Sequence, residues 1–359
     1  MRAIHQFAAG FTNGDAITNE VRTLRAVFRS WGFESDIFSE TRRILPELRK
    51  EARDVSDYVA VARPDDVVLL HLSVGSLVND RFAALPCRKA IFYHNITPAH
   101  YFELVQPQTA QDLKRGRHQL QALAAAAEVN MAVSAFNAGE MTQAGYRDVK
   151  VLPLLLDFDR LAAAPDRQTL SRFADGTVNV LFVGRCAPNK KIEDALEAFR
   201  WFHRFVEPNS RFIHVGSFAG TERYYYLLLA QAKEADLTRI HFAGSVPQPA
   251  LNAFYRCAHV FLCMSEHEGF CIPILESMAA GLPVVAYAAG AVPDTMDGAG
   301  ILFHEKRYDW IAETMGRVVR DAALRAAVVR GQQDRIARYR ARDLAAELRL
   351  HMAPLLGGT

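Results

Sequence analysis

The sequence is poor in cysteine, and its cysteines follow no pattern. The 359 residues include Cys87, Cys186, Cys257, Cys263 and Cys271, with no C-x-x-C spacing. An odd, unpatterned set argues against a disulfide framework and a structural zinc site, so we expect reduced thiols and a cytoplasmic location. The N-terminus lacks the apolar region of a signal peptide, and no apolar run is long enough to span a bilayer.

The chain also lacks a strong charge of either sign. Its formal net charge of +2 is too small to indicate a nucleic-acid partner. With 50% hydrophobic and 23% charged residues, the composition is that of a soluble globular protein. This length predicts two domains of ordinary size rather than one.

Apolar, strand-like runs alternate with helical patterns along nearly the whole chain. Residues 2–8, 67–71 and 90–94 predict strands of a first block, and residues 178–184 open a second block. Such alternation indicates parallel sheets covered by helices on both faces. We therefore predict an α/β protein of two doubly wound parallel-sheet domains, with ligands at the carboxyl ends of the strands in a cleft between the domains.

Proline and alanine between residues 152 and 176 mark the change from one block to the other. The predicted N-terminal domain covers residues 1–165 and the predicted C-terminal domain covers residues 166–339. A last helix, at about residues 340–359, is expected to cross back onto the first domain.

The segment from Glu268 to Glu276 combines a strand end, a polar loop and a helix start. Pro273 suits the first turn of a helix, because its missing N–H has no partner there. Free backbone N–H groups and the positive end of the helix dipole attract phosphate, and we expect them at this helix start. The residues that would supply them are Gly269, Phe270, Cys271 and Ile272. Glu276, expected on the first turn, would accept hydrogen bonds from ribose, and Glu268 from a sugar. The alternative is a capped helix with two surface glutamates.

Arg185 and Lys190 follow the first predicted strand of the second domain. The planar guanidinium and the ammonium are able to converge on one diphosphate from a loop at a strand end. The alternative is two solvated cations.

The first domain offers weaker candidates. Gly14 and Asp15 follow its first strand in a turn that resembles a phosphate-approaching loop without being G-x-G-x-x-G. His94 ends a buried strand and would donate a hydrogen bond to a reacting sugar, although a lone histidine is more often structural. His71 is a weaker candidate of the same kind.

Asp157 and Asp159 form a D-x-D, a motif that binds a divalent metal in some enzymes. Here the motif lies in the interdomain stretch, away from any nucleotide-binding strand. We interpret it as a turn and predict no metal.

Together these residues resemble family-four retaining glycosyltransferases of the GT-B fold. Arg185 with Lys190 is similar to the family's G-R-x4-K, and Glu268 with Glu276 is similar to its E-x7-E. The segments around Gly14 and His94 look like members that build bacterial surface polysaccharides. The chain departs from the pattern at Cys271 and Lys191, where many members have glycine.

The resemblance implies a retaining hexosyltransferase that needs neither metal nor cofactor. The donor would be a UDP- or GDP-sugar, with mannose as the expected hexose, and the acceptor a saccharide or lipid-linked saccharide. Arg185 and Lys190 would hold the diphosphate, Glu268 the donor sugar and Glu276 the ribose. His94 and the turn at Gly14 and Asp15 would complete the site from the first domain.

The first domain also carries basic stretches at residues 42–43, 49–50 and 114–117. They would suit peripheral contact with an anionic membrane that holds a lipid-linked acceptor, or else form a solvated face.

Three rival functions stay open. A nucleotide-sugar epimerase would need the dinucleotide fingerprint that is missing after the first strand. A non-catalytic GT-B module would be expected to lose its glutamate pair or its basic pair. A retaining phosphorylase of related fold would cleave with phosphate and use no sugar nucleotide.

Overall fold

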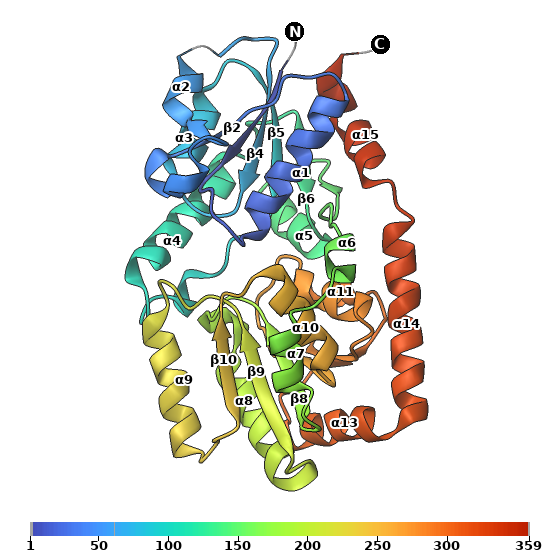
Figure 1. The fold of residues 1–359 in the computed structure, drawn as a ribbon. Helices are drawn as coiled ribbons and strands as arrows, with labels where there is room; N and C mark the ends of the chain where they lie inside the picture. The colour runs from blue at the N-terminus through green and yellow to red at the C-terminus, as the bar shows by residue number, and fades with distance from the viewer. Residues whose placement is uncertain (1–2, 61, 358–359) are drawn as a thin grey trace. The chain divides into compact units, whose positions relative to one another are not determined.

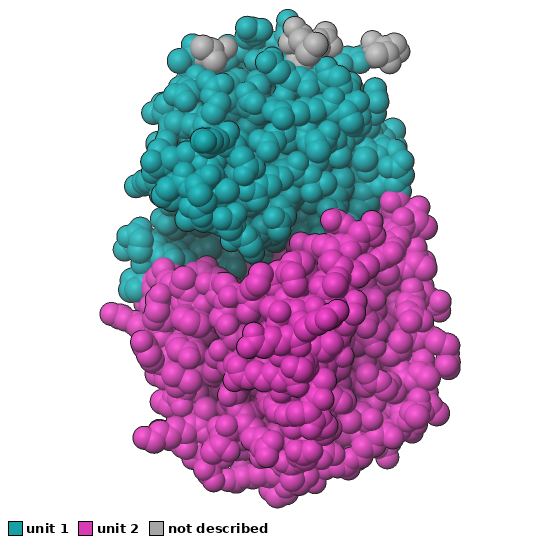
Figure 2. All heavy atoms as spheres, in the orientation of Figure 1, with its two compact units in different colours: residues 1–100, 107–156, 343–359 teal, residues 101–106, 157–342 magenta. Residues whose placement is uncertain are grey.

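The computed structural model describes residues 3–60 and 62–357, and their contacts divide the chain into two compact units. Unit 1 comprises Met1–His100, Pro107–Leu156 and Asp343–Thr359, and unit 2 comprises Tyr101–Gln106 and Asp157–Arg342 (Figure 2). The contact boundaries thus fall after residues 156 and 342, whereas the domain boundaries expected from the sequence, near residues 165 and 340, stay predictions. Every described helix is too short or too polar to cross a membrane.

Unit 1 is built on a parallel sheet in the order β3-β2-β1-β4-β5-β6-β7 (Figure 1). Its strands are β1 (Ile4–Ala8), β2 (Ile37–Ser39), β3 (Arg53–Asp54), β4 (Val67–Leu72), β5 (Arg88–Tyr93), β6 (Val129–Ala132) and β7 (Lys150–Val151). Its helices are α1 (Ala16–Ser30), α2 (Val55–Val59), α3 (Leu77–Ala84), α4 (Pro107–Ala122), α5 (Ala135–Gln143) and α15 (Leu344–Leu356). The first predicted strand includes residue 2, which lies outside the described residues. The two-residue strands β3 and β7 are too short to give a sequence signal.

Unit 2 is built on a second parallel sheet, in the order β10-β9-β8-β11-β12-β13. Its strands are β8 (Val178–Val183), β9 (Ser210–Val215), β10 (Ile240–Gly244), β11 (Val260–Cys263), β12 (Val284–Tyr287) and β13 (Ile301–Phe303). Its helices are α6 (Asp159–Ala162), α7 (Arg167–Phe173), α8 (Ile192–Trp201), α9 (Glu222–Glu234), α10 (Gln248–Cys257), α11 (Ile272–Ala279), α12 (Val292–Met296), α13 (Tyr308–Arg320) and α14 (Ala322–Arg340). Two all-parallel sheets confirm the predicted fold class.

Helix α15 packs within unit 1, although it follows α14 of unit 2 in the chain. Leu344, Leu348 and Met352 are buried along one side of it. Arg88 at the start of β5 donates a hydrogen bond of 2.8 Å to the carbonyl oxygen of Leu355. The apolar spacing along the last helix therefore marks the face that covers the first sheet.

Candidate functional site

In unit 2 the strand order reverses between β8 and β11, which are hydrogen-bonded neighbours. The chain runs outward from β8 to β9 and β10 on one side and from β11 to β12 and β13 on the other. In doubly wound sheets the loops beyond such a switch point diverge and leave a crevice where ligands bind. The loops that follow β8 and β11 carry the predicted basic and glutamate motifs. The topology therefore brings these two motifs together.

Lys190 and Glu268 form an ion pair at this switch point. The Lys190 Nζ lies 2.6 Å from Glu268 Oε2, and the two side chains are 20% and 6% exposed. Burial is the largest single effect on the Lys190 ammonium and lowers its pKa, but the charge and hydrogen bond of Glu268, together with Cys271 and Cys263, raise that pKa, and the net shift is upward. Lys190 is therefore a cation beside a buried carboxylate, and an anionic ligand at this point would compete with Glu268 for it.

The loop that carries Glu268 is held by hydrogen bonds with Asn189 on one side and by close packing against Gly290 on the other. Asn189 donates a hydrogen bond of 3.0 Å from Nδ2 to the carbonyl oxygen of His267, and its own carbonyl oxygen accepts from Glu266 N at 3.0 Å. Across the loop, a Cβ on Gly290 would lie 2.8 Å from the backbone nitrogen and oxygen of Glu268. The backbone at Gly290 packs directly against the backbone of Glu268 and leaves no room for a side chain, so position 290 accepts only glycine. Asn189 stands beside Lys190 in the motif, but nothing in the sequence indicated its role.

Helix α11 begins without a side-chain cap, because Cys271 at the N-cap makes no cap hydrogen bond. Cys271 adopts a left-handed conformation with φ of 66°, which costs a residue with a side chain about 1–2 kcal/mol. Lys191, at the N-cap of α8, is left-handed too, with φ of 51°. These are the two positions where the resembling family often has glycine, and the backbone geometry explains that preference.

Glu276 lies in the second turn of α11, because the helix begins at Ile272; the expectation of a first-turn position was wrong. Its carboxylate is buried between Arg160, which forms an ion pair with Oε1, and Tyr255, whose hydroxyl donates to Oε2 at 2.7 Å. Burial, followed by the charge of Glu276, raises the pKa of Tyr255 well above its usual value. A carboxylate has about four lone-pair sites, so about two remain for further hydrogen-bond donors. Sequence reasoning missed Arg160 and Tyr255, because neither belongs to a recognisable motif.

Arg185 is exposed in the loop after β8 and donates a hydrogen bond of 3.2 Å to the carbonyl oxygen of Ala219. Phe270 is buried, and its carbonyl oxygen accepts a hydrogen bond from the Thr295 hydroxyl. Gly269 and Ile272 lie on either side, in the loop and at the start of α11. The predicted donor-site residues of unit 2 thus lie on the segment that follows β8 and on the loop and helix α11 that follow β11.

In unit 1, the turn at Gly14 and Asp15 starts helix α1. The Asp15 carboxylate accepts hydrogen bonds from Thr18 N at 3.0 Å and from the Thr18 hydroxyl at 3.1 Å. Gly14 has a φ of +73°, and no atom lies within 4 Å of the position its Cβ would take. Asp15 therefore acts as an N-cap, while the glycine leaves backbone accessible beside it.

His94, just after β5, belongs to a chain of polar side chains on β1 and β4. The Gln6 side-chain amide donates from Nε2 to the carbonyl oxygen of Val21, which leaves its Oε1 facing His71. This oxygen therefore accepts a hydrogen bond of 3.0 Å from His71 Nε2. His71 Nδ1 then has to accept from His94 Nε2, 2.9 Å away. Burial keeps both rings neutral: it lowers the pKa of His71 well below its usual value and that of His94 to about 3. In this tautomer the remaining Nδ1 of His94 is an acceptor, so a hydrogen bond from His94 to a sugar would need the other tautomer, and the role of His94 stays a prediction.

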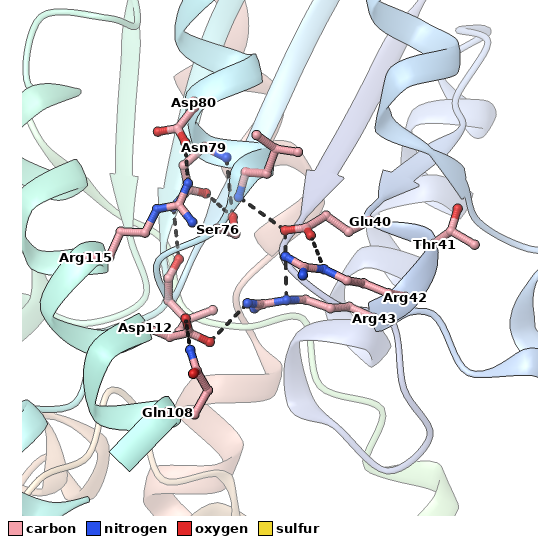
Figure 3. Close-up of polar contacts among 12 residues, drawn as sticks. Glu40, Thr41, Arg42, Arg43, Ser76, Asn79, Asp80, Gln108, Asp112 and Arg115 are labelled. Carbon is pink, nitrogen blue, oxygen red and sulfur yellow. Dashed lines mark hydrogen bonds and ion pairs between the residues drawn. The ribbon is translucent and has the colours of Figure 1, made fainter. Parts of the chain in front are cut away.

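Arginines in two of the three basic stretches of unit 1 form ion pairs within the unit. Arg43 lies 3.0 Å from an Asp112 oxygen, and Arg42 lies 2.7 Å from an oxygen of Glu40 (Figure 3). Arg115 pairs with Asp80 in the same network (Figure 3). Ion pairs of this kind reduce the positive charge available to an anionic surface, so membrane contact stays a prediction.

The D-x-D residues form a turn at the start of α6. Asp157 accepts a hydrogen bond of 2.9 Å from the backbone N–H of Asp159, and both side chains are exposed.

The comparison with protein families finds a match that lies within unit 2. Residues 169–335 match the family model described as "Glycosyl transferases group 1". The D-inositol 3-phosphate glycosyltransferase of Acidothermus cellulolyticus is 37% identical over 180 residues, 47% of this chain and 39% of that protein. The O-antigen chain mannosyltransferase B of Escherichia coli is 28% identical over 153 residues, 42% of this chain and 39% of that protein. These matches span well under half the length of the curated relatives.

A solved structure resembles the whole chain. Anabaena Alr3699/HepE in complex with UDP and glucose has a TM-score of 0.72 at 18% identity, with 100% of both chains covered. At that identity the likeness establishes the fold, which is the GT-B fold of two parallel-sheet domains.

Proposed function

We propose, on the premise that residues 169–335 match the glycosyl transferases group 1 family model, that the protein transfers a sugar from a nucleotide-sugar donor bound by unit 2. The carrying observation is the Lys190–Glu268 pair, which joins the two predicted donor motifs at the switch point of the unit 2 sheet. The uncapped N-terminus of α11 beside it supports the same proposal, since free N–H groups there favour a phosphate.

We assign the proposed roles of the residues from their charges. Lys190, Arg185 and the α11 N-terminus take up the negative charge that develops on the diphosphate leaving group. Glu268 turns from Lys190 toward the donor sugar's hydroxyls, and Glu276, held by Arg160 and Tyr255, accepts from the ribose. For a retaining transfer, attack comes from the face that the diphosphate leaves, and a phosphate oxygen accepts the acceptor's proton.

The roles of unit 1 are proposed from the resemblance alone. The turn at Gly14 and Asp15 offers backbone to the donor, and His94 accepts a hydrogen bond from a donor hydroxyl through Nδ1 instead of donating one.

We further propose a hexose as the transferred sugar and a saccharide or lipid-linked saccharide as its acceptor. Support for mannose comes from the name of the Escherichia coli relative, and support for a UDP donor from the bound UDP of HepE. The name of the Acidothermus relative supports a small phosphorylated acceptor equally well. UDP and GDP donors therefore both belong in the first test.

A thermal-shift screen against UDP-, GDP- and ADP-sugars is expected to reveal one stabilising donor. At a hundredfold excess over Kd, a ligand bound only by the native state stabilises by about 2.7 kcal/mol. The cognate donor should also support transfer to a saccharide acceptor. A protein that is stabilised by no sugar nucleotide, but cleaves a glycoside only with inorganic phosphate, would be a phosphorylase and would refute the proposal. Stabilisation without any turnover would instead indicate a non-catalytic binding module.

Transfer is expected to need no hard divalent cation. The proposed diphosphate partners are side-chain cations and backbone N–H groups, which supply the positive charge that Mg²⁺ supplies elsewhere. Protein freed of metal by a chelator, with the chelator then removed, should turn over at the same rate with and without Mg²⁺ or Mn²⁺. A rate that collapses on chelation and returns only with one of these cations would contradict this.

A further inference from the structure

Cys263, Glu268 and Cys271 offer three metal-ligand atoms within 4.8 Å of one another in the proposed donor site. Cys263 ends β11, Glu268 lies in the following loop, and Cys271 is the N-cap of α11. All three side chains are buried, with exposed fractions of 0%, 6% and 8%. One strand-loop-helix segment therefore gathers two thiols and a carboxylate in a small volume.

The side chain of Cys271 stands at a position whose left-handed backbone favours glycine. With φ of 66° the position favours glycine, so the side chain is kept at a conformational cost. The Cys263 sulfur lies 3.4 Å from the Ser265 hydroxyl, which keeps it turned toward the loop. The two thiols are close enough for each to influence the other's ionisation.

We propose that these three residues form an inhibitory site for a thiophilic divalent cation such as Zn²⁺ or Cd²⁺. Thiolates select such ions over Mg²⁺, and a tetrahedral zinc with sulfurs at about 2.3 Å holds them about 3.8 Å apart. That separation fits within the spread of the three ligand atoms. A fourth tetrahedral position is left for water.

Charge balance at the site is favourable. Binding converts the cation, two thiols and one carboxylate into a complex of charge −1 and releases two protons to solvent. The Lys190 ammonium, now 2.6 Å from Glu268, remains beside the complex and neutralises it. Coordination takes the Glu268 carboxylate away from the donor sugar, so metal and donor exclude each other. This inhibition rests on the proposed function, whereas metal binding does not.

Cadmium titration of the reduced full-length protein tests the binding. We expect the protein to bind one equivalent of Cd²⁺. Binding should produce the ultraviolet absorption of cadmium–thiolate bonds and release two protons. Loss of a residue that only hydrogen-bonds to a metal ligand weakens metal binding by about 10–100-fold. Because Cys263→Ser removes a ligand itself, it should weaken Cd²⁺ binding by more than that. Cys257→Ser, at a buried thiol outside the cluster, should bind as the parent does. If Cys263→Ser does not fold, Cys271→Gly carries the test, since glycine suits that backbone.

Thiolate absorption that is absent, or unchanged in both cluster variants, would overturn the site. Transfer assays test the inhibitory part: Zn²⁺ should abolish donor turnover, and EDTA should restore it. Stoichiometric binding with unimpaired turnover would overturn the inhibition. A protein that binds Cd²⁺ at this site, yet transfers no sugar under any condition, would leave the metal site standing and remove the proposed function.

Discussion

Replacing Lys190 by alanine is expected to lower kcat/KM for sugar transfer by about 10²–10³-fold, the cost of removing one preorganised group that stabilises transition-state charge. The Lys190 ammonium is the cation that the structure holds against the buried Glu268, at the end of the switch-point strand. Removing it leaves that carboxylate without its ion-pair partner, so the melting temperature should fall as well. Circular dichroism and thermal melts, alongside initial rates, separate lost chemistry from lost fold.

Lys191→Gly provides the matched control. Its Nζ pairs with Glu193 at 3.3 Å and Glu266 at 3.7 Å, and its φ of 51° suits glycine. The variant removes an adjacent positive charge and should keep turnover within a few-fold of the parent. Near-parental turnover of folded Lys190→Ala would remove Lys190 from the proposed site.

Glu268→Gln is expected to reduce kcat/KM by a similar factor, about 10²–10³-fold. The amide keeps the shape of the side chain but loses the charge that pairs with Lys190, and one oxygen that accepts from hydroxyls becomes a donor. Glu266→Gln is the control: it lies in the same loop, and its carboxylate pairs with Lys306 at 2.6 Å instead. Initial rates at saturating and limiting donor would show whether the loss falls on kcat or on KM.

The double variant Lys190→Ala/Glu268→Ala distinguishes a catalytic pair from a structural one. Breaking a buried ion pair from one side costs about 3–5 kcal/mol, because one charge is left unpaired, and removing both charges recovers much of that cost. We expect the melting temperature to recover in the double variant while turnover does not. Turnover that recovered together with stability would show that the pair serves only the fold.

Both departures from the resembling family fall on left-handed residues, Lys191 and Cys271. A left-handed backbone conformation explains the usual glycine at both positions. At each of these positions the chain carries a side chain where the family pattern often has glycine. For Cys271, that side chain completes the cluster with Cys263 and Glu268.

The fold was determined by patterns that the sequence carries locally. Continuous apolar runs such as residues 67–71 predict strands buried on both faces, and the alternation with helices leaves parallel sheets as the arrangement that buries them. The strand-loop-helix around Glu268 was predictable for the same reason, because Pro273 and the apolar strand before it act over a few residues.

Only the tertiary structure decided which side chains meet. Lys190 and Glu268 are 78 residues apart, and Arg160 and Glu276 are 116 apart. The order of the strands brings the first pair together, and the packing of α6 within unit 2 brings the second pair together. The same holds for His94, whose hydrogen-bonding capacity depends on Gln6 and His71 on two other strands. Residue types and local periodicity fix what a segment becomes, but a side chain's charge state and free lone pairs depend on neighbours that packing supplies.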